Sequence, residues 1–60
     1  MTYDKYTEQA EIVTRTGQDS WDDVREWFGN MSVSEIRAEC DRCWPGDNNA
    51  ELAERIYNAL

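Results

Sequence analysis

The chain contains no histidine, so the commonest general base and the commonest metal ligand of proteins are both missing. No histidine can activate the serine and threonine hydroxyls as nucleophiles, and Lys5 is the only lysine available for that role. The three glycines are isolated from one another, so no glycine-rich phosphate loop is present. Asp22 and Asp23 are adjacent, and adjacent side chains on a helix do not face each other as a catalytic pair would. These absences predict a protein that is not an enzyme and has no catalytic residues and no cofactor.

Long apolar runs are also missing. No run exceeds two residues, so we expect no membrane span. The first residues are polar and lead into no apolar stretch, which predicts the absence of a signal peptide and a cytoplasmic location. Cys40 and Cys43 should then be reduced, because the cytoplasm is a reducing compartment.

Positive charge is scarce. The chain has thirteen acidic residues and only six basic ones, so its formal net charge is −7. A field of this sign repels nucleic acid and anionic lipid, and it attracts basic protein surfaces. We therefore expect no direct contact with nucleic acid or membrane, and a basic protein surface as the partner.

The length of 60 residues allows one domain, and we treat 1–60 as a single small acidic helical domain. A chain of this size buries only about 60% of the surface that its unfolded form exposes. Large aromatic side chains compensate for this, and we expect Trp21, Trp27, Trp44 and Phe28 in the core. Short loops between helical segments predict an all-α fold, a compact bundle of three to four short helices.

The first predicted helix covers about 3–15. Tyr3, Tyr6, Ala10 and Val13 recur at helical spacing on one face, and Gly17 is a stop signal. The β-branched stretch 12–16 leaves an extended conformation open as an alternative.

Serines mark the starts of the next two helices. Ser20 is a good N-cap for the second, and Ser32 with Glu35 forms a capping box at the start of the third. Met31 is expected to pack on Ile36 as a hydrophobic staple. The expected stops are Gly29-Asn30 and Pro45-Gly46, and Asp47 or Asn48 is expected to cap a last helix.

Four acids form the main candidate site. Asp19, Asp22, Asp23 and Glu26 recur at i, i+3, i+4 and i+7, on the side expected to lie opposite Trp21, Val24 and Trp27. Their density is about one charge per 4 Å, close to the 3.4 Å of a single DNA strand. Such a row can occupy the basic groove of a nucleic-acid-binding protein. The alternative is that acids favour a helix start through the dipole and keep an outer face solvated.

Cys40-Asp41-Arg42-Cys43 is a C-x-x-C sequence, which can be a redox pair or half of a zinc site. A zinc site would need carboxylates such as Glu39 or Asp47, or a second subunit, because no histidine is available. A redox role fits poorly, since the pair falls in the last turns of a helix, where the dipole disfavours a thiolate. We expect small buried apolar residues and no metal site.

Residues 21–60, taken as three short helices, are loosely similar to ubiquitin-associated three-helix modules, mainly in 48–56. Such modules carry a Met-Gly-Phe-like loop after their first helix. Here Gly29-Asn30-Met31 stands in its place, so the residues that would contact ubiquitin are missing. The chain is therefore not assigned to that family.

These observations predict a non-enzymatic acidic binding protein. The leading hypothesis is an inhibitor that blocks the basic groove of a nucleic-acid-handling protein by nucleic-acid mimicry, similar in size and charge to small acidic proteins of phages and other mobile elements. The expected contacts are Asp19, Asp22, Asp23 and Glu26, followed by Glu8, Glu11, Glu51 and Glu54. The alternative is a protein-interaction module or homodimer that uses apolar surface together with Tyr3 and Tyr6.

Overall fold

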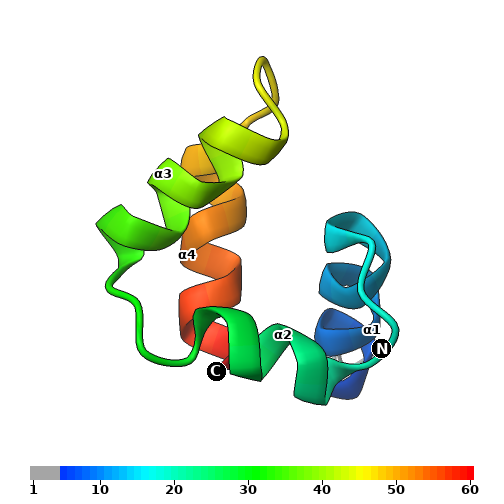
Figure 1. The fold of residues 1–60 in the computed structure, drawn as a ribbon. Helices are drawn as coiled ribbons and strands as arrows, with labels where there is room; N and C mark the ends of the chain where they lie inside the picture. The colour runs from blue at the N-terminus through cyan, green and yellow to red at the C-terminus, as the bar shows by residue number, and fades with distance from the viewer. Residues whose placement is uncertain (1–4) are drawn as a thin grey trace.

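The computed structural model describes residues 5–60, which form four helices and no strand. They are α1 (Lys5–Thr16), α2 (Trp21–Phe28), α3 (Val33–Cys43) and α4 (Asn49–Ala59). The predicted all-α bundle of short helices is confirmed (Figure 1). No helix within the described range is long and apolar enough to cross a lipid bilayer.

The helix starts of α2 and α3 follow the predicted serine caps. The Ser20 side chain accepts a hydrogen bond from the Asp23 backbone N–H. At α3 both halves of the capping box form: the Glu35 N–H donates to Ser32 Oγ, and the Ser32 N–H donates to Glu35 Oε1. Each cap satisfies backbone donors that the first turn of a helix leaves unpaired.

The end of α1 lies at Thr16, and Gly17 follows it with a φ of +71°. The Gln18 N–H donates to the Val13 carbonyl and the Gly17 N–H to the Thr14 carbonyl, the bonding pattern of a Schellman motif. The predicted stop is therefore correct, and the helix extends one residue beyond the predicted end. Tyr3 lies outside the described residues.

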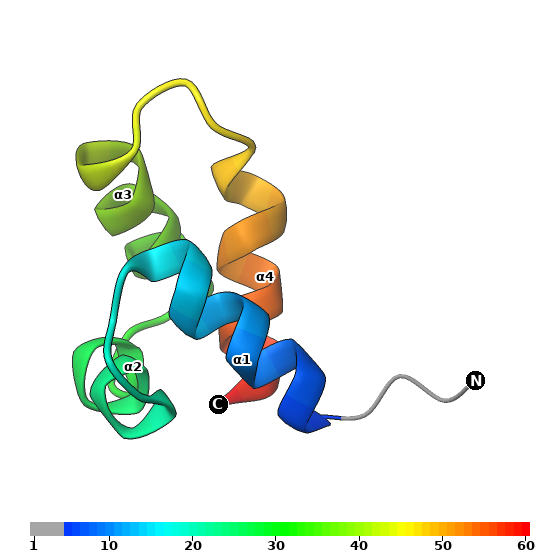
Figure 2. The same cartoon turned by 90° about the vertical axis from the view of Figure 1, so that its right-hand side faces the viewer.

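The helices α3 and α4 form an antiparallel pair, joined by the loop 44–48. Figures 1 and 2 both show these two helices side by side, with α2 at the foot of the pair and α1 beside α4. In Figure 2, α2 is viewed nearly along its axis. Contacts between α1 and both α2 and α4 close the bundle.

Every helix contributes to the core. Phe28 is fully buried at its centre, and the aliphatic side chains of Ile12, Ile36 and Ile56 are equally inaccessible. Met31 is half-buried and packs against the same cluster, as its predicted staple position requires. The complete set of buried apolar residues is Ile12, Val24, Phe28, Ile36, Cys40, Leu52, Ala53 and Ile56.

The buried side chains of α1 do not belong to the predicted series that contains Tyr6, Ala10 and Val13, although Val13 is partly buried and packs against the core. Ile12 and Thr16 are buried, whereas Tyr6 is 70% exposed and Ala10 is exposed. Thr16 tolerates burial because its hydroxyl donates a hydrogen bond to the Ile12 carbonyl at 2.7 Å, so this buried hydroxyl is not left unpaired. Because threonine is polar, Thr16 was not counted in the apolar pattern, and the buried pair of Ile12 and Thr16 was not predicted.

The tryptophans flank the core and do not fill it, which corrects the expectation that they lie inside. Trp21, Trp27 and Trp44 are half-buried and pack against the buried cluster. Trp27 stacks on Phe28 with ring centroids 4.4 Å apart, and its centroid is 6.0 Å from that of Trp44. Tryptophan is large and is rarely buried completely, which agrees with the intermediate burial of all three residues.

Candidate functional site

The acidic face consists of Asp19, Asp22, Asp23 and Glu26, at and just before α2. The Ser20 cap sets the start of the helix and places Asp22 and Asp23 in its first turn, where the helix dipole favours negative charge. Asp19, Asp22 and Glu26 are exposed, and Asp23 is half-buried. The structure thus brings the four predicted side chains to the surface of one short segment.

Most of the arginines form ion pairs with carboxylates outside the acidic face. Arg15 pairs with Asp47 at 2.6 Å, and Arg42 pairs with Glu39. Arg55 joins α4 to α1 through Glu8 at 2.7 Å and Glu11 at 3.9 Å. On the acidic face, Arg25 pairs with Asp22 at 2.9 Å. These ion pairs engage five acids with four guanidinium groups, because Glu8 and Glu11 share Arg55.

The remaining carboxylates fall into two groups. Glu35, Asp41 and Glu51 accept hydrogen bonds from neutral groups within the chain. Among the described residues, the carboxylates with neither an ion pair nor a hydrogen bond are Asp19, Asp23, Glu26 and Glu54. Three of these four belong to the acidic face, so unbalanced negative charge is concentrated at α2.

Trp27 borders the acidic face, which corrects the prediction that it lies on the opposite side. Asp23, Glu26 and Trp27 line one shallow hollow of about 460 Å³, together with Gln18. The spacing Asp23–Trp27 is i, i+4, which places two side chains next to each other on a helix and could have indicated this contact. No basic residue is among those that line the hollow.

The second set of predicted acids is divided between α1 and α4. Glu8 and Glu11 are held by Arg55 and contribute to the contact between these helices. Glu51 and Glu54 line another hollow, of about 480 Å³, in which Arg37 is also a lining residue. The carboxylates on α4 therefore have a guanidinium nearby, and the hollow beside Trp27 does not.

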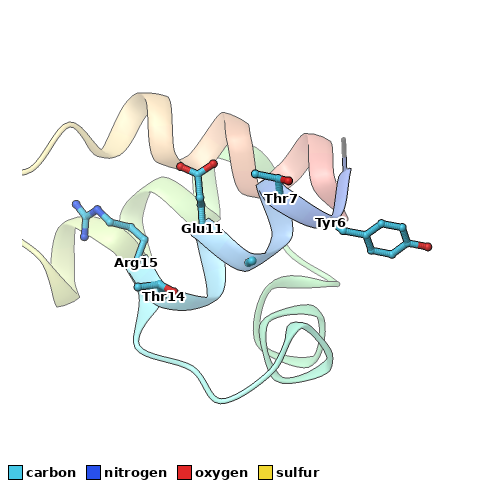
Figure 3. Close-up of a pocket in the computed structure, with 6 residues that line it drawn as sticks. Tyr6, Thr7, Glu11, Thr14 and Arg15 are labelled. Atoms are coloured by element: carbon cyan, nitrogen blue, oxygen red, sulfur yellow. The ribbon is translucent and has the colours of Figure 1, made fainter. Parts of the chain in front are cut away.

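A tyrosine-bearing surface runs along the outer side of α1. A hollow of about 630 Å³ on this surface is lined by Tyr6, Thr7, Ala10, Glu11, Thr14 and Arg15. Figure 3 shows the Tyr6 ring extending outward from the helix. The Lys5 ammonium lies 5.4 Å from the centroid of that ring. Of the two predicted contact tyrosines, Tyr6 is thus presented to solvent, and Tyr3 lies outside the described residues.

The two cysteines carry free thiols in different environments. Cys40 is buried, and burial raises the pKa of its thiol from 9.0 to about 11. Cys43 is half-buried, and its thiol donates a hydrogen bond to Glu39 Oε1, with Sγ 3.7 Å from that oxygen. In the range 5–60 no cluster of three or more cysteine or carboxylate side chains has the geometry of a metal site.

Comparison of the chain with protein-family models, with curated proteins and with solved structures finds no match.

Proposed function

We propose that the chain is a non-enzymatic binding protein whose acidic face docks into the basic groove of a nucleic-acid-binding protein and blocks it. The partner contributes lysine and arginine side chains that would otherwise contact phosphates. The setting that we propose is the cytoplasm, whose reducing conditions match two unbridged cysteines.

One observation supports this proposal above the others. Asp19, Asp23 and Glu26 carry charges that no basic group of the described chain balances. The helix dipole favours Asp23 in the first turn of α2, but it does not account for Glu26, which lies beyond that turn, and neither residue has the arginine partner that Asp22 has in Arg25. The three unbalanced carboxylates occur within the eight residues 19–26, and the two that lie in α2, Asp23 and Glu26, are about 4.5 Å apart along the helix axis, compared with about 3.4 Å per charge in a single DNA strand.

Competition with nucleic acid tests this proposal. The tagged chain is used to retrieve its partner from the cell in which it occurs, and the purified pair is titrated with duplex DNA and with single-stranded RNA. We expect one of these polymers to displace the chain, because both ligands would occupy the same basic groove. A retrieved partner that binds nucleic acid and the acidic chain simultaneously would contradict the proposal.

A second candidate function is self-association or partner binding through the tyrosine-bearing surface of α1. The observation in its favour is the 70% exposure of Tyr6 at the edge of the 630 Å³ hollow. Sedimentation of Tyr6→Ser beside Tyr57→Ser tests it, because Tyr57 is an exposed tyrosine on α4. Loss of an assembly in the first variant alone supports this candidate, and a monomer at all concentrations contradicts the homodimer.

A further inference from the structure

We infer that the hollow formed by Asp23, Glu26 and Trp27 is a receptor for an arginine side chain of the partner, and that it distinguishes arginine from lysine. This inference rests on the proposed function and specifies its chemistry. The guanidinium would lie against the Trp27 ring, and its N–H groups would donate to the two carboxylates. The occupant is therefore a basic protein segment that presents arginine.

The chain contains the same arrangement in an occupied form. The Arg15 guanidinium lies 5.9 Å from the centroid of the Trp44 ring and donates to Asp47 Oδ2 at 2.6 Å. One tryptophan and one carboxylate there hold an arginine from α1. Beside α2, Trp27 lines a hollow with two carboxylates, and no arginine or lysine lines it.

The packing of Trp27 makes it a fixed wall for this hollow. The fully buried Phe28 ring stacks on the Trp27 indole with the ring centroids 4.4 Å apart. The Trp44 ring centroid lies 6.0 Å from that of Trp27. A ring held in this way loses little conformational freedom when a ligand binds. Trp27 is half-buried and lines the hollow together with Asp23 and Glu26.

Arginine suits this site better than lysine for two physical reasons. Its planar guanidinium stacks on an aromatic face and donates several hydrogen bonds in a fixed plane, whereas an ammonium is a strongly hydrated point charge. Contact of a cation with tryptophan at an exposed site corresponds to an affinity gain of about two- to five-fold. Carboxylates alone would attract both cations.

Two peptides of equal length and charge, one built from arginine and one from lysine, test the inference. Their affinities for the folded chain are measured by calorimetry at low ionic strength. We expect the arginine peptide to bind more tightly, by at most about fivefold, because the lysine peptide also gains from the aromatic contact but cannot stack on the ring as a planar guanidinium does. In Trp27→Leu this ratio should fall, while the attraction of both peptides to the carboxylates persists.

A second measurement uses the unaltered chain and does not depend on the folding of a variant. The indole N–H resonances of the three tryptophans are followed by NMR during each titration. The arginine peptide should shift the Trp27 resonance more than those of Trp21 and Trp44, and the lysine peptide should shift it less. In Asp23→Asn/Glu26→Gln the Trp27 response should be lost.

The outcomes separate this inference from the proposed function. Equal affinities of the two peptides, an unchanged ratio in Trp27→Leu, or no binding of either peptide would overturn the arginine receptor. None of these results alters the competition between the chain and nucleic acid for a retrieved partner. Conversely, simultaneous binding of nucleic acid and chain would overturn the proposed function, whatever the peptides show.

Discussion

Arg55 on α4 donates a hydrogen bond from Nε to Glu8 Oε1 on α1 at 2.7 Å. The two residues are 47 positions apart in the sequence, so this contact is a tertiary link between the ends of the chain. The Glu8 side chain is only 23% exposed, whereas that of Asp22 on α2 is 82% exposed. Glu8 therefore links α1 to α4, and its role as a partner contact stays a prediction.

The first prediction concerns this link. A double-mutant cycle of Glu8→Gln and Arg55→Gln should give a coupling energy of about 0.5–1 kcal/mol in urea unfolding, because the pair is partly shielded from solvent. The matched cycle of Asp22→Asn and Arg25→Gln, a pair within one helix, should give about 0.2–0.5 kcal/mol. Equal coupling energies would show that the Arg55–Glu8 pair contributes no more than an ordinary surface pair.

The second prediction concerns the cap of α3. Ser32→Ala should lower the free energy of unfolding by about 1 kcal/mol, since it leaves the Glu35 N–H without its acceptor. Ser34→Ala is the control, because Ser34 is an exposed serine of the same helix and is not the cap. Equal thermal stability of the two variants would contradict the role of the capping box.

The third prediction follows from the same cap in acid. Hydrogen bonds from the Ser32 backbone and side chain lower the pKa of Glu35 below its ordinary value of 4.5. A lowered pKa means that the Glu35 contribution to stability is complete above 4.5 and is lost as the pH falls through the lowered value. An NMR titration of the Glu35 carboxyl carbon should show a midpoint below 4.5 that moves upward in Ser32→Ala. A midpoint that is identical in both proteins would contradict this account.

The fourth prediction concerns the two thiols. Burial raises the pKa of Cys40 from 9.0 to about 11, so folding favours its protonated form. The resulting stability is complete below pH 9.0 and declines as the pH rises through about 11. A disulfide reagent at pH 8 should therefore modify Cys43 first and reach Cys40 only on unfolding in urea. Equal rates at both thiols of the folded chain would contradict the buried position of Cys40.

The local features of the fold were predictable because short stretches of sequence determine them. Ser20, Ser32 with Glu35, and Gly17 each act on backbone groups within a few residues of themselves, and these signals function as the sequence indicates. The expected side-chain cap of α4 does not form: Asn48 occupies the N-cap position, but its side chain donates to Glu51 Oε2 and caps no backbone N–H. The helix order and the all-α class follow from these signals.

The features that depend on tertiary packing were not predictable in the same way. The inward face of α1 could have carried Tyr6 or Ile12, since both series have helical spacing, and contacts with the other helices select Ile12. The contact of Trp27 with the acids, by contrast, was indicated by the i, i+4 spacing of Asp23 and Trp27. The acidic row itself was predictable, but the ion pairs that leave part of it unbalanced were not, because Arg55 and Arg15 reach acids far away in sequence.

The central claim is that the charge at α2 is recognised by a partner, and two matched variants test it. The first is the double variant Asp23→Asn/Glu26→Gln on α2, and the second is Glu51→Gln/Glu54→Gln on α4. Both raise the formal net charge by the same amount. Each removes one first-turn carboxylate and the acid three residues later, on α2 and on α4 respectively.

The measurement is the affinity of each variant for the retrieved partner over a range of salt concentrations. We expect the α2 variant to lose at least about tenfold in affinity and to show a shallower salt dependence, because hydrogen bonds between charged groups contribute about 1.5–3 kcal/mol each. The α4 variant should bind like the unaltered chain. Equal affinities and equal salt slopes for the two variants would contradict the claim that the acidic face of α2 is the binding surface.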